Sequence, residues 1–430
     1  MTAILLITFF VLVFLTVPIA FALLAAAMAT LAAMSGINDI PLALIPSSLY
    51  AATANFSLLA IPFFVLAGNI MVVGGIAKRL VDFFNALIGG VAGGLAHAAT
   101  LACMFFAALS GSSAATAASI GKALIPEMER HRYDKKFSAA VVATGGILGM
   151  IIPPSIAMIV YAMTAEVSVT QLFSGGVIPG LLGGLAIMAY SFFFARKHNY
   201  TLTEEELKRR PGLFRAFLNA FWAITMPVVI LGGIYGGIFT ATEASAIAVL
   251  YGVLVSLIYR EITIRSFIEA VIDAVYDTAT ILLIMGSSAI LGWVLVVLQL
   301  PQSLAAAMLG FSSNPYVILL LILVLYLIIG CFIGTSPAIV LVVPILLPAI
   351  KAVGIDLVFF GVFTVFALGI GLITPPVGTD LFVVSSIARL KFEDVVRAVV
   401  PLIVIYTLLC VLFIFVPQLI TFLPDLVTVQ

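Results

Sequence analysis

Charged residues are scarce in this chain. Asp, Glu, Lys and Arg make up 9% of its 430 residues, against about a quarter in ordinary soluble domains. Hydrophobic residues make up 64%, so a water-soluble fold is excluded. Lys and Arg number 19 and Asp and Glu also number 19, which leaves no net charge to attract nucleic acid. Nucleic-acid binding is therefore excluded as well.

Cysteine and histidine are also few, with three of each. Cys103, Cys331 and Cys410 lie inside apolar runs without neighbours at metal-ligand spacing, which predicts small buried side chains and neither a disulfide framework nor a zinc site. The histidines are scattered, and no enzyme signature is present. The glycine-rich segment 89–94 lacks the Lys-Ser/Thr pair of a phosphate loop. We expect no cofactor, and any pumping must draw on an ion gradient.

The chain contains many long apolar runs. A spanning helix needs about 20 apolar residues, and lipid tolerates only helices and closed barrels. No ten-residue alternation indicates a barrel, so the sequence predicts an all-α integral membrane protein. The run from Thr2 to Met34 is too long for a cleaved signal peptide and predicts a retained first span. Nine spans are expected, at about 3–34, 56–76, 137–166, 172–195, 217–240, 242–259, 277–300, 355–388 and 395–420.

Two further apolar segments, 92–126 and 316–350, are interrupted by clusters of Gly, Ser, Thr and Pro. The interruptions are Ser110-Gly-Ser-Ser113 and Gly334-Thr-Ser-Pro337. Each arm then holds fewer residues than the roughly 20 that a span requires. The sequence therefore predicts two re-entrant helical hairpins, each entering and leaving on one side of the membrane.

The hydrophilic segment 196–216 carries six basic residues and is expected to be a cytoplasmic linker, because basic loops stay inside. If the interrupted segments are hairpins, counting spans outward from this linker places every other basic cluster inside too. The N-terminus then falls inside, the C-terminus outside, and the charge-free stretch 300–315 forms a periplasmic loop. The basic clusters are Lys78/Arg79, Arg130 to Lys136, Arg260/Arg265 and Arg389/Lys391/Arg397.

The two halves of the chain repeat each other at one constant offset. Gly149-Met-Ile-Ile-Pro-Pro154 matches Gly371-Leu-Ile-Thr-Pro-Pro376, and Pro126 and Pro179 match Pro348 and Pro401. The predicted topology makes the repeats inverted, as in many secondary transporters. The first repeat covers 1–195 and the second covers 217–430 with an extra span. The alternative is that Gly and Pro are simply common in membrane helices.

Inverted repeats place substrate and ion sites at broken helices near the membrane midplane. Four breaks are expected: the two hairpin tips and the Pro-Pro breaks at 152–155 and 374–379. Proline and glycine free backbone carbonyls there, and carbonyl and hydroxyl oxygens suit a hard cation. Each tip facing its own Pro-Pro break predicts one cation site per half. The alternative for the Ser and Thr residues is bonding back to their own helices.

Few charged residues lie inside the predicted spans: Lys122, Glu166, Glu243 and Asp380. Lys122 is expected to extend to the cytoplasmic edge, and Glu166 to lie at the outer interface. Asp380 directly follows the second Pro-Pro break, where it can hold a cation or a hydroxyl or ammonium group of a ligand. Glu243 follows Thr240, a pattern that suits local helix capping at least as well as transport.

These segments together resemble the large membrane subunit of tripartite ATP-independent periplasmic (TRAP) transporters, over essentially the whole chain. The segments are SGSSAATAAS (110–119), GMIIPPS (149–155), GGIFTATEASA (236–246), GTSPAIVLVVPILLP (334–348) and LITPPVGTD (372–380). The resemblance implies an elevator-type ion-transporter fold in the bacterial inner membrane. It also implies sodium-coupled uptake of an organic acid, with a periplasmic binding protein and a small four-helix membrane subunit as partners.

Carried over by matching position, the resemblance places sodium ligands at both tips and both breaks. They are Ser110, Ser112, Ser113, Gly149, Ile152, Ser155, Gly334, Thr335, Thr374 and Val377. The substrate would meet Ser113, Pro154, Thr379 and Asp380. Because the two tips differ in sequence, the two sodium sites need not share one ligand set.

Two alternatives to such a permease subunit remain. One is a self-sufficient sodium/dicarboxylate symporter of similar architecture, which the sequence separates poorly. The other is an intramembrane enzyme, which would need a polar triad, metal ligands or a basic headgroup pocket that the spans do not contain. A sialic acid or a four-carbon dicarboxylate is the expected kind of substrate, with selectivity set largely by the binding protein.

Overall fold

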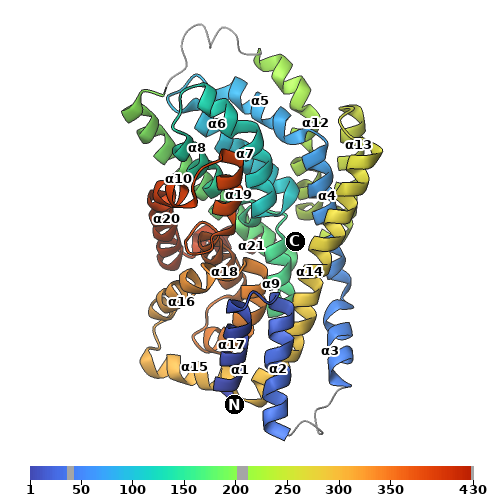
Figure 1. Cartoon of the computed structure of the whole chain (residues 1–430), viewed down its shortest axis with the longest axis vertical. Coiled ribbons are helices and arrows are strands. Elements are labelled where there is room, and N and C mark those ends of the chain that lie inside the picture. Colours follow the sequence, from blue (N-terminus) through green and yellow to red (C-terminus); the bar gives the residue numbers. More distant parts are fainter. Residues whose placement is uncertain (36–42, 201–211, 428–430) are drawn as a thin grey trace.

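The computed structural model describes residues 1–35, 43–200 and 212–427, and it is helical throughout these ranges without a strand (Figure 1). Seven of the described helices are long and apolar enough to cross a membrane, or eight if the bent pair α8 and α9 counts as one span. The predicted all-α membrane fold is confirmed. The first half contains α1 (Thr2–Phe14), α2 (Ile19–Ser35), α3 (Leu44–Thr53), η2 (Phe56–Leu59), α4 (Ala60–Val73), α5 (Ile76–Ile88), α6 (Gly94–Ser110), α7 (Ser113–Arg130), α8 (Lys135–Ile151), α9 (Ile156–Ala165) and α10 (Val169–His198). The second half contains α12 (Leu213–Tyr235), α13 (Ala241–Ile258), α14 (Ile264–Val297), α15 (Leu300–Phe311), α16 (Pro315–Gly330), α17 (Thr335–Ala352), α18 (Leu357–Gly371), α19 (Thr379–Ala388), α20 (Phe392–Phe415) and α21 (Gln418–Val427).

The predicted first span is wrong, because the run is divided into two helices that pack against each other, α1 and α2. Thr16 has a positive φ of 61°, and Pro18 has no amide to continue α1, so the chain turns back between them. The N-terminus therefore lies at the end of the molecule opposite α5 and α12 (Figure 1). This corrects the expectation that it lies on the same side as the linker, whose central part, 201–211, lies outside the described residues.

The predicted loop at 300–315 is also wrong, because most of it forms α15. Pro301 stands in the first turn of this helix, where a missing amide costs nothing. α15 packs along α17. Its counterpart in the first half is α5, a strongly amphipathic helix that precedes hairpin one as α15 precedes hairpin two.

All four predicted helix breaks are present. α6 ends and α7 begins around Gly111, and α16 and α17 are separated by residues 331–334. α8 and α9 are bent by 42° across 152–155, and α18 and α19 are separated by residues 372–378. Both Pro-Pro bonds, Pro153-Pro154 and Pro375-Pro376, are cis.

Helices recur in the same order in the two halves. α7 begins at Ser113 and α17 begins at Thr335, which is the offset that separates the two Pro-Pro motifs in the sequence. α12 and α13 precede α14 as α1 and α2 precede α3 and α4. The packing is exchanged between halves, because α7 packs on α19 while α17 packs on α9, and α20 packs on α8 while α10 packs on α18. Each of these contacts therefore joins one helix of the first half to one helix of the second half.

The helices form two groups (Figure 1). An outer group, α1–α4 with α12–α14, is held together by contacts of α13 and α14 with α4 and of α14 with α2 and α3. An inner group, α6–α10 with α16–α21, contains the four breaks. α5 contacts α12 of the outer group and α6 of the inner group, and α15 similarly connects α14 with α17. α14 also packs directly on α17, and α4 packs directly on α6, so α5 and α15 are two of several connections between the groups.

Basic clusters that are far apart in sequence meet at one end of the molecule, which we call the basic end. Arg79 pairs with Glu261 at 3.2 Å, between α5 and the turn after α13. Lys136 pairs with Asp394 at 2.8 Å, between the N-terminal ends of α8 and α20. This gathering agrees with the prediction that all these clusters face the same side.

We expect Gly371→Ala to destabilise the fold, because a Cβ at this position would lie 2.3 Å from the backbone carbon of Gly330, where α18 meets α16. Overpacking of this kind typically costs about 1–3 kcal/mol. Thermal unfolding of the purified protein in detergent measures the loss. Gly292→Ala is the matched control, because nothing lies within 4 Å of its Cβ position. Equal melting temperatures for the two variants would contradict the close contact.

Candidate functional site

The tip of hairpin one is a tight turn held by hydroxyl groups. Gly111 has a φ of 62°, which reverses the chain between α6 and α7. Ser112 is the N-cap of α7, and its hydroxyl accepts a hydrogen bond from the Ala115 amide at 3.4 Å. The hydroxyls of Ser110 and Thr116 are 2.9 Å apart, and Thr116 donates to the Ser112 carbonyl at 2.8 Å. The tip is thus lined with oxygen atoms.

This tip faces the break of its own half, as predicted. The Ile156 amide at the start of α9 donates to the Gly111 carbonyl at 3.3 Å. Gly149 lies so close that a Cβ there would be 2.4 Å from the Ser112 carbonyl oxygen, so only glycine fits. Ser155 caps α9 by accepting from the Met158 amide at 3.2 Å, and its hydroxyl donates to the Met150 carbonyl. The Ser155 side chain therefore bonds to neighbouring backbone groups, which is the alternative to a ligand role given in the sequence analysis.

Hairpin two repeats the arrangement with different chemistry. The Val377 amide, in the second break, donates to the Cys331 carbonyl at 3.2 Å, so this tip also faces its own break. Gly334 is the N-cap of α17 and offers no side chain to its amides. The Thr335 hydroxyl is 3.6 Å from the Met150 sulfur, across the interface between the halves. Thr374 donates back to the Ile370 carbonyl at 2.7 Å, which is again the alternative to a ligand role.

A cavity of about 290 Å³, which we call the central cavity, lies where the two tips meet. Its lining includes six of the predicted site residues: Ser112, Ser113, Gly334, Thr335, Thr379 and Asp380. The first residues of four helices, α7, α9, α17 and α19, all line it, so four positive helix ends converge there. The other predicted residues, Ser110, Gly149, Ile152, Pro154, Ser155, Thr374 and Val377, do not line this cavity and lie at the tips and breaks around it.

Asp380 is the buried charge of this cavity. It lies in the first turn of α19, has no exposed surface, and accepts a hydrogen bond from the Ser113 hydroxyl of α7. This bond joins the two halves. The second carboxylate oxygen, Oδ1, has no hydrogen-bond partner among the described residues. A buried carboxylate is costly unless a cation, a donor or a proton compensates it, so Oδ1 is a ready ligand for one of these.

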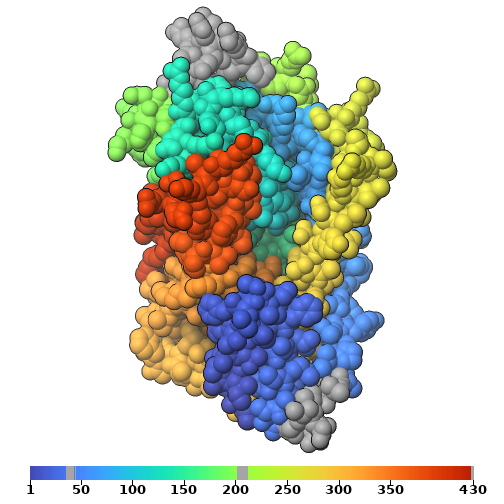
Figure 2. Space-filling model, viewed as in Figure 1, coloured from blue at the N-terminus to red at the C-terminus, as the bar shows by residue number. Residues whose placement is uncertain are grey.

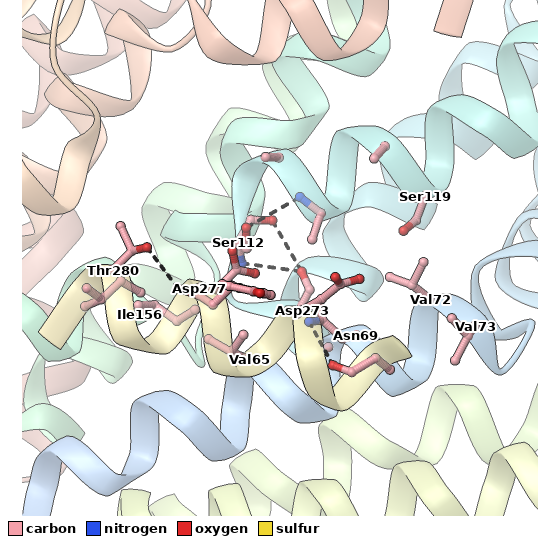
Figure 3. A pocket seen from close by; sticks show the side chains of 18 residues that line it. Val65, Asn69, Val72, Val73, Ser112, Ser119, Ile156, Asp273, Asp277 and Thr280 are labelled. Carbon is pink, nitrogen blue, oxygen red and sulfur yellow. Dashed lines mark hydrogen bonds between the residues drawn. The ribbon is translucent and has the colours of Figure 1, made fainter. Parts of the chain in front are cut away.

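A second, larger cavity of about 590 Å³ adjoins the first, and the two share Ser112, Ala114, Ile156, Thr280 and Ile281. Figure 2 shows a hollow on this face, bordered by α7 and α14. Asp273 and Asp277 of α14 and Asn69 of α4 line it (Figure 3). Sequence reasoning missed Asp273 and Asp277 because it placed the start of this span at 277. Their spacing of four residues on one helix face was the available signal.

A third cavity, of about 440 Å³, continues toward the basic end and shares Val72 and Ser119 with the second. Lys78, Lys122 and Arg130 line it beside Asp82 and Glu127. Burial raises the pKa of the Asp82 carboxyl, and the nearby Lys78 partly offsets this. Together the three cavities form a cleft from the hairpin tips to the basic end. Lys122 is exposed and lines this third cavity, and its extension to the cytoplasmic edge stays a prediction.

The remaining predictions about charged and sulfur-containing residues have clear outcomes. Glu243 accepts from the Thr240 amide at 2.8 Å and completes a capping box at the start of α13, so its local capping role is confirmed. Glu166 is exposed in the C-cap of α9. The three cysteines are free and buried, as predicted.

Broken helices that point their ends into a cavity at the interface of two similarly ordered halves define the class of secondary transporters. The chain belongs to the family described as "Tripartite ATP-independent periplasmic transporter, DctM component", which residues 6–419 match. The resemblance inferred from the sequence is therefore confirmed.

Named relatives agree with this assignment, and a solved structure shares the fold. The chain is 41% identical over 404 residues to the isethionate TRAP transporter permease protein DctMQ of Oleidesulfovibrio alaskensis, covering 93% of this chain and 63% of that protein. It is 36% identical to the 2,3-diketo-L-gulonate TRAP transporter large permease protein YiaN of Escherichia coli, covering 94% of each. The crystal structure of the Alcanivorax borkumensis YdaH transporter matches with a TM-score of 0.64 at 15% identity, covering 93% of this chain and 98% of that one, which supports the fold.

The family is one of transporters, so the intramembrane-enzyme alternative is excluded. The chain is accordingly a multi-pass protein of the bacterial inner membrane. A large component of a tripartite system implies a periplasmic binding protein and a small membrane subunit as partners.

We expect Asp380→Asn to lower transport more than tenfold, which corresponds to about 1.4 kcal/mol or more. The amide retains size and an acceptor for Ser113 but removes the charge. Initial uptake rates in proteoliposomes containing the complete complex measure the effect. Asp356→Asn is the matched control, because Asp356 caps α18 through the Phe359 amide at 2.7 Å and does not line the central cavity. Wild-type transport by Asp380→Asn would make Asp380 a structural residue.

Proposed function

We propose that this chain imports a small organic anion together with sodium, receiving the anion from a periplasmic binding protein. The observation behind this proposal is the central cavity, which the positive ends of α7, α9, α17 and α19 all line. Amide donors at helix starts favour an anionic group. The start of α17 has no side-chain cap, so the first amides of this helix are the best donors for a carboxylate or sulfonate.

Sodium is the better coupling ion because the site combines an anionic substrate with the buried carboxylate of Asp380. Two negative charges in one cavity of about 290 Å³ repel each other strongly unless cations accompany them. The carbonyl ends of α6, α8, α16 and α18 lie at the tips and breaks, beside the hydroxyls of Ser112 and Thr335. Neutral oxygen ligands of this kind suit a hard cation and need no proton.

Named relatives support the substrate class. Isethionate and 2,3-diketo-L-gulonate, which appear in the names of the two relatives, are both small organic anions. A sialic acid or a four-carbon dicarboxylate belongs to the same class. The cleft leads from the cavity to the basic end, which the positive-inside rule assigns to the cytoplasm, so this conformation suits release of the substrate inside.

The two groups of helices suit an elevator motion. The inner group contains both tips and both breaks and supplies most of the lining of the central cavity, to which α14 of the outer group adds Thr280, Ile281 and Ile284. The outer group presents exposed apolar side chains such as Phe214, Val228 and Leu254. In our proposal the inner group carries the substrate while the outer group holds the small subunit. α5 and α15 each contact both groups, so in this proposal they link the groups while the inner one moves.

We expect the chain to be nearly inactive alone and to transport only with its small subunit and binding protein, because it has no soluble domain in its described residues to capture dilute solute. Uptake in proteoliposomes, with each partner omitted in turn, tests this. Robust sodium-driven uptake by the isolated chain would instead support the self-sufficient symporter.

We expect Ser112→Ala and Thr335→Ala each to raise the sodium concentration for half-maximal uptake by about tenfold, the effect of losing one contact of about 1.4 kcal/mol. Ser168→Ala controls for helix capping, because Ser168 caps α10 by accepting from the Gln171 amide at 3.4 Å, the distance found for Ser112. The control should lose a similar capping energy of about 1 kcal/mol without changing sodium dependence. Uptake that follows an imposed pH gradient without sodium would refute sodium coupling.

A further inference from the structure

Two carboxylates face the cleft beside hairpin one without a compensating charge. Asp273 and Asp277 are four residues apart on α14, so their side chains share one face of that helix. Both are exposed to the cavity of about 590 Å³ rather than packed against protein. Within the described ranges, neither makes an ion pair. Acidic side chains inside a membrane helix need a ligand or water, because lipid cannot solvate them.

A separate observation on the opposite wall also indicates a ligand. Ser119 of α7 is 7% exposed, and its hydroxyl has no hydrogen-bond partner among the described residues. It lines the same cavity, and its side chain points from α7 toward the gap between α7 and α4 (Figure 3). A buried hydroxyl without a partner costs free energy unless a ligand or water satisfies it. The wall formed by α4 adds Asn69, whose amide donates to the Ala270 carbonyl at 3.4 Å.

Asp273 and Asp277 lie along the cleft, and their negative charge does not suit holding an anionic substrate. The cavity that contains Asp273 and Asp277 shares Ser112 with the central cavity on one side and Ser119 with the cavity at the basic end on the other. Any solute that leaves hairpin one for the basic end passes these carboxylates. They repel an anion and attract a cation, and the open cleft keeps that attraction weak enough for release.

We propose that Asp273 and Asp277 form a weak sodium site in the cleft, which receives sodium released from hairpin one before it reaches the cytoplasm. The Ser119 hydroxyl supplies a neutral ligand from the opposite wall. The sodium keeps part of its water shell, since the cavity is far larger than one ion. This site is distinct from the hairpin sites, but it rests on the proposed sodium coupling.

Sodium binding by the purified full chain tests the proposal without depending on transport. We would titrate sodium against a choline background and follow ²³Na NMR line broadening, with the melting temperature as a second readout. The wild type should show two components. Ser112→Ala and Thr335→Ala should weaken the tighter one, whereas Asp273→Asn with Asp277→Asn should weaken only the other.

The size of the expected change follows from Coulomb's law. In bulk water a unit charge about 4 Å away concentrates a counter-ion about fivefold, so removing two carboxylates should raise half-saturation of the weak component by about 10–25-fold. Glu269→Gln is the matched control, because Glu269 lies on the same helix, pairs with Arg265 at 3.0 Å and does not line the cleft. It should leave both components unchanged, and Asp273→Glu with Asp277→Glu should retain the weak one.

The outcomes separate this proposal from the proposed function. An unchanged weak component in the double Asn variant would overturn the cleft site while leaving the hairpin sites intact. A melting temperature that rises with millimolar magnesium but not with sodium would overturn it too. If the double Asn variant loses stability, the double Glu variant decides, since loss of the weak component there would contradict a role of the carboxylates.

Discussion

A helix that stops inside a membrane leaves its terminal amides and carbonyls without water to bind, and this constraint governs the structure. The chain meets it by making the breaks face each other. The Gly111 carbonyl receives the Ile156 amide, and the Cys331 carbonyl receives the Val377 amide. The first residues of α7, α9, α17 and α19 line the central cavity, so helix ends that are costly inside a membrane face a space where a ligand can bind.

The exchange of partners between halves determines which parts can move together. α7 packs on α19 and α17 packs on α9, so the two hairpins and the two broken helices form one interlocked inner group. The Ser113 and Asp380 contact lies at the centre of this exchange. Movement of one hairpin alone would break contacts with both halves. The outer group contacts the inner group through α5 and α15 and also directly, chiefly where α14 packs on α17 and α4 packs on α6, so relative motion must change these direct contacts too.

The sequence is informative where glycine and proline coincide. The motifs ending in Pro154 and Pro376 predicted both breaks, and the constant offset between the halves predicted the equivalent order of helices. Glu243 was predictable as a cap because capping depends only on residues close together in the sequence.

The failures concern features that hydropathy does not record. The turn at Thr16 lies inside an unbroken apolar run, and α15 lies in a charge-free segment that resembles a loop. Asp273 and Asp277 gained meaning only when α14 was placed against α4 and α7, which come from the first half of the chain.

The helix contacts between the two halves determine when the inner group can assemble in the membrane. Translation delivers α6 to α10 before any of α17 to α20 exists, so the Ser113 hydroxyl and the apolar flank of α9 enter the membrane without their eventual neighbours. The ribosome must add most of the second half before Asp380 reaches Ser113. The inner group can therefore be completed only after α19 has been synthesised.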